Sequence, residues 1–269
     1  MKVAVLREGP EEARVAVVPG TVKELVKAGV QVVVASGAGE ASGVSDADYI
    51  EAGAEVSPDG AAALAGAQVL LAVQPPRDGN GPGELGSLPR DLALVSFLDP
   101  LGDLERASRL AERGVSAFSM ELIPRTTRAQ RMDALSSQAT VAGYKAVLMA
   151  ANALPKLMPM FMTAAGTIRP AKALVLGAGV AGLQAIATAR RLGARVEAFD
   201  VRPAVREQVE SLGATFLETE HEVAAEGEGG YAKELSEEQH QRELELIAAH
   251  ISDTDLVVTT AQIPGRPAP

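Results

Sequence analysis

Short apolar runs alternate along the chain with longer segments in which apolar residues recur at the 3.6-residue spacing of an amphipathic helix. In the first half of the chain the runs predict strands, and the periodic segments between them predict helices. The predicted strands are Val3–Leu6, Val30–Ala35, Val69–Val73, Leu92–Leu98 and Val115–Phe118, and the predicted helices are Thr21–Ala28, Asp46–Ala52, Asp59–Ala65 and Leu101–Arg113. This alternation is typical of βαβ units and a mostly parallel sheet.

A long helical pattern follows at residues 133–154, stopped by Pro155, and a second series of strands and helices comes after it. The predicted strands of this series are Ala173–Leu176, Arg195–Phe199, Ala214–Leu217 and Leu256–Thr260, with a helix that ends near Arg191. We therefore predict an α/β chain of two doubly wound, Rossmann-like domains with mostly parallel sheets, residues 1–135 and 136–269, joined by the long helix. Only about four strands are recognisable after residue 170, whereas such sheets usually have six, so we expect the natural protein to be longer.

Four methionines cluster around the end of the long helical pattern: Met149, Met158, Met160 and Met162. Methionine is flexible and fills irregular apolar gaps. We interpret the cluster as a soft core or as the seam of a dimer.

The chain has 269 residues, a formal net charge of −10, no cysteine, and three histidines that all lie after residue 220. Phosphate contacts need Lys or Arg, so this acidic balance argues against nucleic acid and anionic lipid as partners. The absence of cysteine excludes disulfides and thiolate metal sites. Lys145, Asn152 and Lys156 interrupt the most apolar stretch, which leaves no span near the ~20 residues that cross a bilayer. We expect a cytoplasmic chain without direct membrane insertion.

A glycine-rich loop opens the second series. Gly177, Gly179 and Gly182 directly follow a predicted strand and precede a helix. In a dinucleotide-binding loop the first glycine permits the tight turn, the second lets backbone approach the pyrophosphate, and the third lets the helix pack closely. Asp200 ends the next strand, where a carboxylate accepts from ribose hydroxyls and repels a 2′-phosphate. The pattern predicts a site for NAD(H), although Arg202 is a residue type that meets a 2′-phosphate, and a plain turn is the alternative.

Two other segments of this half are candidates for the same site. Thr260 and Gln262 follow the last predicted strand, and the carboxyl ends of parallel strands face the ligand crevice. Residues 218–245 contain ten glutamates and several glycines, which predicts an exposed flexible lid or, equally well, a disordered acidic loop.

The densest polar segment of the chain runs from residue 124 to residue 138, at the start of the long helical pattern. Asp133 and Ser136 are three residues apart and share a helix face, with Gln130 one turn earlier. These side chains can bind a carboxamide and a ribose through hydrogen bonds. The alternative is a solvated helix start in which Asp133 is a cap.

These motifs together resemble the NAD(H)-binding alpha subunits of proton-translocating nicotinamide nucleotide transhydrogenases, from Arg14-Val15-Ala16 to the end of the chain. The matching segments are residues 128–138, 142–144, 162–168, 177–182, 198–202, 229–233 and 263–265. Segment 125–138 is the specific one, because the related alanine dehydrogenases share the glycine loop but not that segment. One departure is Gln262, where the family usually has Leu.

The resemblance implies direct hydride transfer between NAD(H) on this chain and NADP(H) on a partner subunit, coupled to proton translocation by a separate membrane domain. It also implies a homodimer at the cytoplasmic side of the inner membrane, held there through partner subunits. The implied nicotinamide residues are Arg125, Gln130, Asp133 and Ser136; Val180, Asp200, Val201 and Arg202 line the adenosine half; and Gly230, Tyr231 and Ala232 lie on a closing loop.

Two other functions are open alternatives: an alanine dehydrogenase-like amino acid oxidoreductase and a non-catalytic NAD-sensing module. An amino acid dehydrogenase moves a proton as well as a hydride and needs a general acid or base. Alanine dehydrogenases carry Lys and His at the positions of Gln74 and Asp99, and this chain has no histidine before residue 221. Hydride transfer between two nicotinamides requires neither group, which favours the transhydrogenase hypothesis.

Overall fold

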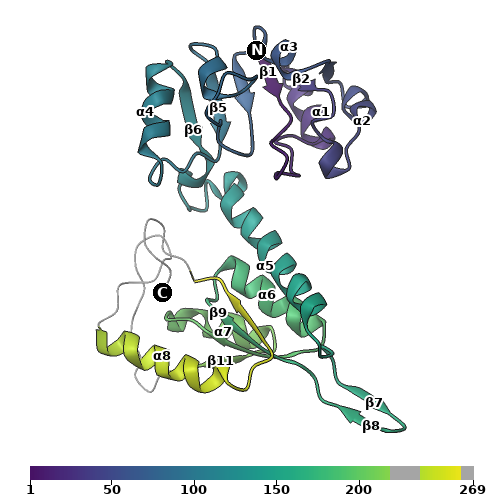
Figure 1. Ribbon diagram of the computed structural model, residues 1–269, viewed down its shortest axis with the longest axis vertical. Coiled ribbons are helices and arrows are strands. Elements are labelled where there is room, and N and C mark those ends of the chain that lie inside the picture. The colour runs from purple at the N-terminus through teal and green to yellow at the C-terminus, as the bar shows by residue number, and fades with distance from the viewer. Residues whose placement is uncertain (219–236, 262–269) are drawn as a thin grey trace. The chain divides into compact units, whose positions relative to one another are not determined.

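The computed structural model describes residues 1–218 and 237–261, with only the backbone course for 237–240 (Figure 1). The chain divides into two compact units, Met1–Asp133 and Ala134–Pro269, and each is described by itself. Among the described residues, no helix is long and apolar enough to cross a membrane.

Unit 1 is built on six parallel strands in the order β3-β2-β1-β4-β5-β6. The strands are β1 (Lys2–Val5), β2 (Gln31–Ala35), β3 (Glu55–Ser57), β4 (Val69–Leu71), β5 (Ala93–Ser96) and β6 (Ser116–Ser119). This is the strand order of a doubly wound fold, and the direction of winding reverses between β1 and β4. Ligands of such sheets bind outside the carboxyl ends of the strands at the point of reversal.

The helices of unit 1 are α1 (Pro19–Lys27), α2 (Asp46–Glu51), α3 (Gly60–Leu64) and α4 (Leu104–Glu112), with short 3₁₀ turns η1 (Glu40–Ser42), η2 (Leu85–Ser87), η3 (Met120–Leu122) and η4 (Gln130–Met132). Alternate strand residues point to opposite faces, so Val5 and Val34 join one core cluster while Ala4 and Leu94 join another. Because both faces are covered, the strands consist of nearly continuous apolar residues.

Unit 2 begins with α5 (Ala134–Ala153), followed by a two-stranded antiparallel hairpin, β7 (Phe161–Thr163) and β8 (Gly166–Ile168). Four parallel strands in the order β11-β10-β9-β12 form its main sheet. The remaining elements are β9 (Lys172–Leu176), α6 (Val180–Arg191), β10 (Arg195–Phe199), η5 (Pro203–Val205), α7 (Arg206–Ser211), β11 (Thr215–Leu217), α8 (Glu237–Ile251) and β12 (Leu256–Thr259).

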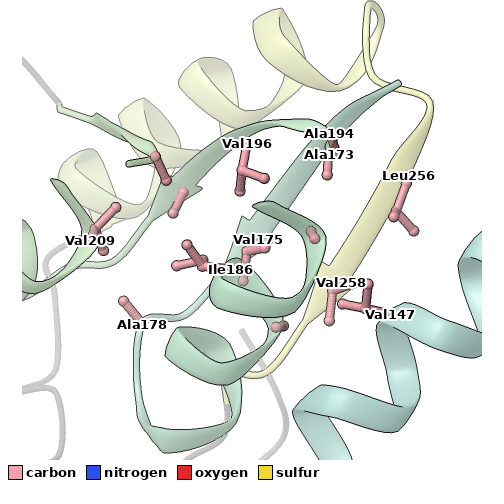
Figure 2. Close-up of a cluster of buried hydrophobic side chains, with 14 of the residues drawn as sticks. Val147, Ala173, Val175, Ala178, Ile186, Ala194, Val196, Val209, Leu256 and Val258 are labelled. Carbon is pink, nitrogen blue, oxygen red and sulfur yellow. The ribbon is translucent and has the colours of Figure 1, made fainter. Parts of the chain in front are cut away.

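The sheet of unit 2 is covered on both faces. Figure 2 shows Val147 of α5 beside Val258 of β12, in a cluster that also contains Val175 and Ile186. On the opposite face, Leu246 and Ile247 of α8 pack against a second cluster that includes Leu174, Phe199 and Leu217. Since α5 packs on α6 and on this sheet, it belongs to unit 2 rather than standing between the units.

The predicted fold class is confirmed, and so are the five predicted strands of the first half, the four strands after residue 170 and the long helix, which spans Ala134–Ala153. The sequence patterns missed β3, α7 and the hairpin β7–β8, because three-residue strands and short helices carry no measurable period. The prediction of a flexible lid at residues 218–245 is wrong for residues 237–245, which form the first part of α8. Residues 219–236 of that segment lie outside the described residues.

The interpretation of the methionine cluster as core holds only for Met158, which is 7% exposed. Met149, Met160 and Met162 are 57–78% exposed in this chain, so they are not core residues. The two hairpin strands lie outside the main sheet and every residue in them is exposed, which explains why Met162 is not buried. The dimer seam remains a prediction.

Candidate functional site

The glycine loop joins β9 to α6 with the backbone geometry that a dinucleotide loop requires. Gly177 has a φ of +93°, a conformation that residues with a Cβ rarely adopt. A Cβ on Gly182 would lie 1.8 Å from the carbonyl oxygen of Gly177, so only glycine lets α6 approach the loop this closely. A Cβ on Gly179, by contrast, would meet nothing within 4 Å. The first and third glycines therefore build the loop, and the second faces open space where a ligand can approach.

Thr260 secures this loop from the next strand. Its hydroxyl is 2.9 Å from the carbonyl oxygen of Gly177, to which it donates, and its backbone N–H donates to Leu176 at 2.8 Å. The sequence predicted that Thr260 contacts the dinucleotide; its contacts in the structure are with the loop backbone. Gln262, predicted beside it, lies outside the described residues.

The helix that follows the loop offers its N-terminus to an anion. Gly179 is the N-cap of α6 and no side chain caps the first turn. The first N–H groups of a twelve-residue helix and its partial positive charge stabilise phosphate. Val180 begins the helix and is 37% exposed, so it can line a nucleotide at this position.

Asp200 ends β10 and is bound on both carboxylate oxygens. Oδ1 accepts from the backbone N–H and the Nε of Arg202, each at 2.9 Å. Oδ2 accepts from the backbone N–H of Ala178 at 2.7 Å and from Nη2 of Arg202 at 2.9 Å. Burial acts to raise the pKa of Asp200, but the hydrogen bonds from Arg202 and Ala178 outweigh it and hold the pKa below its ordinary value. The bond to Ala178 also ties this carboxylate directly to the glycine loop.

Two neighbours complete the surroundings of Asp200. Val201 packs against the cluster of Leu174, Phe199 and Leu217 that α8 covers. Glu243 of α8 is half-buried, and burial together with the charge of Asp200 raises its pKa to about 7. The sequence analysis missed Glu243. The available signal was its spacing from Leu246 and Ile247, which places the carboxyl on the apolar face of α8.

The predicted nicotinamide residues lie at the end of unit 1 and the beginning of unit 2. In unit 1, Arg125 Nε is 3.7 Å from Asp133 Oδ2, and η4 between them carries an exposed Gln130. Ser136 lies in the first turn of α5, in unit 2. The structure therefore brings Arg125 and Asp133 together. The predicted residues Gly230, Tyr231 and Ala232 lie outside the described residues.

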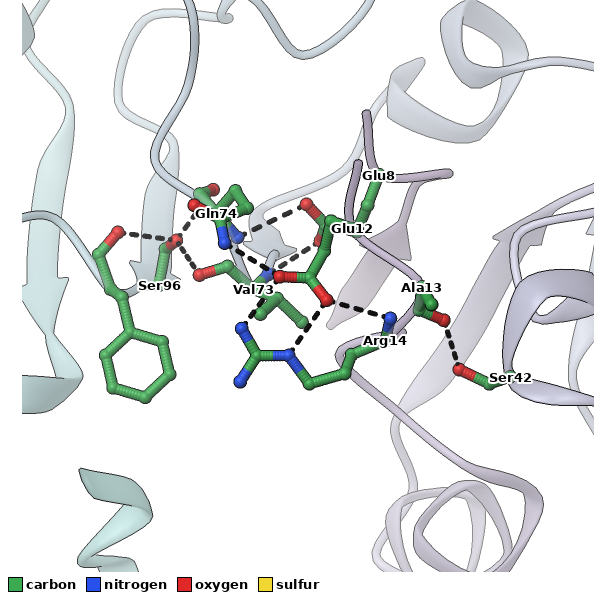
Figure 3. A network of polar contacts seen from close by, with 9 residues as sticks. Glu8, Glu12, Ala13, Arg14, Ser42, Val73, Gln74 and Ser96 are labelled. Carbon is green, nitrogen blue, oxygen red and sulfur yellow. Dashed lines mark hydrogen bonds and ion pairs between the residues drawn. The ribbon is translucent and has the colours of Figure 1, made fainter. Parts of the chain in front are cut away.

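A second polar cluster, which the sequence analysis did not single out, lies at the reversal point of the sheet of unit 1 (Figure 3). We define the β1–β4 polar cluster as Glu8, Glu12, Arg14 and Gln74. Glu12 accepts from Nε and Nη2 of Arg14 at 2.8 and 2.7 Å and from Gln74 Nε2 at 2.7 Å, while Glu8 accepts from the backbone N–H groups of Val73 and Gln74. Two carboxylates and an arginine directly after the first strand were the signal that could have found it.

The charges of this cluster are strongly coupled. The hydrogen bond from Arg14 lowers the pKa of Glu12 to about 2, whereas burial raises the pKa of Glu8 above its ordinary value. Gln74 is held by Glu12, and Asp99 lies in a turn at a φ of +48° whose backbone N–H donates to Glu121. Neither position therefore offers the lysine or histidine that a proton-transferring dehydrogenase would need there.

An apolar hollow of about 720 Å³ is a separate feature of unit 1. Its lining includes Leu98, Leu110, Val115, Phe118 and Met132, from α4, β6 and the adjacent loops. It shares no residue with the predicted nucleotide or nicotinamide residues. An apolar lining of this kind does not supply the donors that a pyrophosphate needs.

Comparison with known proteins gives two family matches that together cover nearly the whole chain. Residues 4–142 match the alanine dehydrogenase/PNT N-terminal domain, and residues 146–269 match the alanine dehydrogenase/PNT C-terminal domain.

Individual relatives agree with these matches. The chain is 46% identical to the NAD(P) transhydrogenase alpha subunit, first polypeptide, of Rhodospirillum rubrum, over 100% of this chain and 71% of that protein. It is 45% identical to NAD(P) transhydrogenase subunit alpha of Cereibacter sphaeroides, over 100% of this chain and 51% of the relative. The crystal structure of a transhydrogenase from Sinorhizobium meliloti superimposes with a TM-score of 0.89 at 46% identity, over 100% of this chain and 72% of that one. Similarity to an alanine dehydrogenase of Halomonas elongata is lower, 32% identity over 74% of this chain and 53% of that protein.

Proposed function

Since the chain belongs to the alanine dehydrogenase/PNT family, and within it to the alpha subunits of NAD(P) transhydrogenases, we propose that it binds NAD(H) and exchanges a hydride with NADP(H) held by a partner subunit. The observation that carries the proposal is the loop between β9 and α6. It joins an open approach at Gly179, an uncapped helix start and the buried carboxylate of Asp200. These are the features that fit the pyrophosphate and the adenosine ribose of a dinucleotide.

Each group of residues has its own role in this proposal. Gly177 and Gly182 shape the loop, Gly179 admits the pyrophosphate, and Val180, Asp200, Val201 and Arg202 line the adenosine half. Arg125, Gln130, Asp133 and Ser136 hold the nicotinamide and its ribose, with Gln130 directed towards the partner's NADP(H). Thr260, Gln262, Gly230, Tyr231 and Ala232 are the remaining proposed contacts.

The proposed chemistry is transfer of a hydride from C4 of one nicotinamide to C4 of the other. No proton is taken or released at either carbon, so the protein needs no general acid or base. Neutral side chains such as Gln130 and Ser136 are then sufficient, because they orient the rings and exclude water. The replacement of proton-transferring groups by Gln74 and Asp99 fits this chemistry and weakens the alanine dehydrogenase-like alternative.

The assembly belongs to the same proposal. We propose that the chain acts as a homodimer and associates with NADP(H)-binding and membrane-spanning transhydrogenase subunits, which couple hydride transfer to proton translocation. On this view the chain is cytoplasmic and reaches the inner membrane only through those subunits.

The decisive experiment combines the purified chain with its NADP(H)-binding partner subunit, NADPH and an oxidised NAD⁺ analogue with a shifted absorption band. We expect fast reduction of the analogue in a single turnover. Gln130→Ala should slow this transfer by about 100-fold or more while it changes analogue affinity only a few-fold, because the side chain orients the transfer rather than anchoring the nucleotide. Gln31→Ala, an exposed glutamine of unit 1 that bonds Glu55, is the matched control.

Two results would contradict the proposal. Appreciable reduction of NAD⁺ with L-alanine by the chain alone would instead favour the amino acid oxidoreductase. Tight NADH binding without any transfer, in a preparation with verified partner association, would favour the NAD-sensing module.

A further inference from the structure

Two residues with opposite nucleotide preferences stand two positions apart after β10. A carboxylate at the end of this strand selects the ribose hydroxyls of NAD, whereas an arginine nearby accommodates the 2′-phosphate of NADP. This chain has both, Asp200 and Arg202. In the structure they are bound to each other, because Nε and Nη2 of Arg202 each donate to a different oxygen of Asp200 at 2.9 Å. The guanidinium that suits a 2′-phosphate is thus engaged by the carboxylate that repels one.

We propose that Arg202 is a latent 2′-phosphate ligand that Asp200 holds inactive. Asp200 then excludes NADP(H) in two ways: it repels the phosphate by its own charge, and it occupies the guanidinium that would bind the phosphate. This inference rests on the proposed NAD(H) site, and it assigns a specificity role to Arg202 that the glycine loop and Asp200 alone do not provide.

The geometry makes this pair a strong competitor for Arg202. The Asp200 side chain is 6% exposed and that of Arg202 is 18% exposed, so water screens the ion pair weakly. The two parallel donors of a guanidinium match the two oxygens of a carboxylate, which is the most favourable form of this interaction. Asp200 is itself fixed by the backbone N–H groups of Ala178 and Arg202. A 2′-phosphate would have to displace a partner that is permanently present two residues away.

The same geometry is tolerant of a ribose hydroxyl. A carboxylate offers about four acceptor positions, and in the structure four protein donors occupy those of Asp200. A hydroxyl brings its own proton, so it can replace one guanidinium bond while the other persists. A 2′-phosphate dianion brings no donor and can gain only by taking the guanidinium away from Asp200.

Glu243 strengthens the bias against phosphate. Its carboxyl is close enough to Asp200 for the charge of Asp200 to disfavour its ionisation. When Glu243 does ionise, two carboxylates stand against the single positive charge of Arg202. For an enzyme that exchanges hydride between NAD(H) here and NADP(H) on its partner, this discrimination keeps one nucleotide of each kind in place.

Nucleotide binding to the complete chain tests the inference. Dissociation constants for NADH and NADPH, and for 5′-AMP and 2′,5′-ADP as fragments that lack the nicotinamide, are measured for the wild type, Asp200→Ser and the double variant Asp200→Ser/Arg202→Gln. We expect Asp200→Ser to bind NADPH and 2′,5′-ADP about tenfold or more tightly than the wild type, because the freed guanidinium forms charge-assisted bonds to phosphate. The double variant should lose that gain.

Two controls separate this effect from its neighbours. Asp253→Asn removes one negative charge from an exposed site of the same unit and should leave the affinity for NADPH unchanged. Asp200→Asn keeps an oxygen that can accept from Ala178, so it replaces Asp200→Ser if that variant does not fold. It should gain affinity for 2′,5′-ADP in the same direction.

The outcomes are distinguishable. A gain in NADPH affinity that persists in the double variant would show simple charge repulsion and overturn the role of Arg202, as would no gain in either Asp200 variant when NADH binds the wild type. Failure of the wild type to bind NADH would overturn the proposed function itself. A gain that depends on Arg202 supports the inference, and weaker 2′,5′-ADP binding at high salt would accompany it.

Discussion

At the scale of single residues, the three glycines of the β9–α6 loop have different physical roles. Gly177 and Gly182 are required by the protein itself, since a side chain on either would collide with backbone. Gly179 is required only by the proposed ligand, since a side chain there meets open space. Sequence comparison alone treats the three positions alike, so substitutions that separate them are informative.

Gly182→Ala and Gly179→Ala should therefore fail in different ways. The added methyl of Gly182→Ala would lie 1.8 Å from a backbone oxygen, and we expect the free energy of unfolding to fall by about 2 kcal/mol or more. Gly179→Ala should change stability by less than about 0.5 kcal/mol but weaken NADH binding about tenfold or more, because the methyl blocks the backbone approach of the pyrophosphate. Denaturant unfolding and NADH titration measure both quantities. Equal loss of stability in the two variants would contradict this division.

At the scale of secondary-structure elements, the contact between α5 and α6 fixes where the nucleotide loop begins. A Cβ on Gly143 of α5 would lie 2.0 Å from the carbonyl oxygen of Ala181 in the first turn of α6. The two helices therefore meet backbone to backbone next to the helix start that is proposed to bind phosphate. The α5 helix is thus both a covering layer of the sheet in unit 2 and a support for the loop.

Gly143→Ala tests this support because its sign is opposite to the ordinary effect. Within a helix, a change from Gly to Ala usually stabilises by about 1 kcal/mol. Here the methyl would force α5 away from α6, so we expect a net loss of about 1–3 kcal/mol and weaker NADH binding. The thermal midpoint and NADH affinity are compared with those of Ala142→Gly, which carries only the helix-propensity cost at an exposed neighbour. A raised thermal midpoint for Gly143→Ala would refute the close contact.

At the scale of the whole molecule, an acidic chain of net charge −10 also buries some of its acidic groups. Glu243 has a pKa raised to about 7, above its value of 4.5 in an unfolded chain. The folded state therefore binds more protons between these two values, and its stability is greatest below about pH 4.5 as far as this group is concerned. That contribution is lost as the pH rises through about 7.

Glu243→Gln should accordingly flatten the dependence of stability on pH between about 5 and 7. Because the side chain is half-exposed, solvent screening reduces the effect to about 1 kcal/mol or less, with the variant the more stable protein above pH 7. Thermal unfolding across this pH range measures it. Glu245→Gln, on the same helix, removes the same charge from an exposed position. Equal flattening in both variants would point to the net charge rather than to the neighbourhood of Asp200.

The sequence by itself determined the order and type of the longer elements, the two-unit organisation of the α/β fold and the glycine loop. These depend on local features: the period of apolar residues, the helix-stopping proline at Pro155, and glycines spaced within one turn. Elements of three to six residues, such as β3 and α7, escaped because so few residues show no period. The same limit hid the hairpin β7–β8, whose exposed strands have no buried face to produce alternation.

Only the tertiary structure decided how distant groups modify one another. Glu243 meets the field of Asp200, Gly143 touches Ala181, and Gln74 is held by Glu12 across 62 positions of sequence. Even for Asp200 and Arg202, two residues apart, the sequence offered two opposite nucleotide preferences, and the structure showed that the two side chains bind each other. The physical reason is that a local pattern fixes which face a residue occupies. The charge, hydrogen-bond partner and free space around that residue come from segments that reach it only when the sheet and its helices pack.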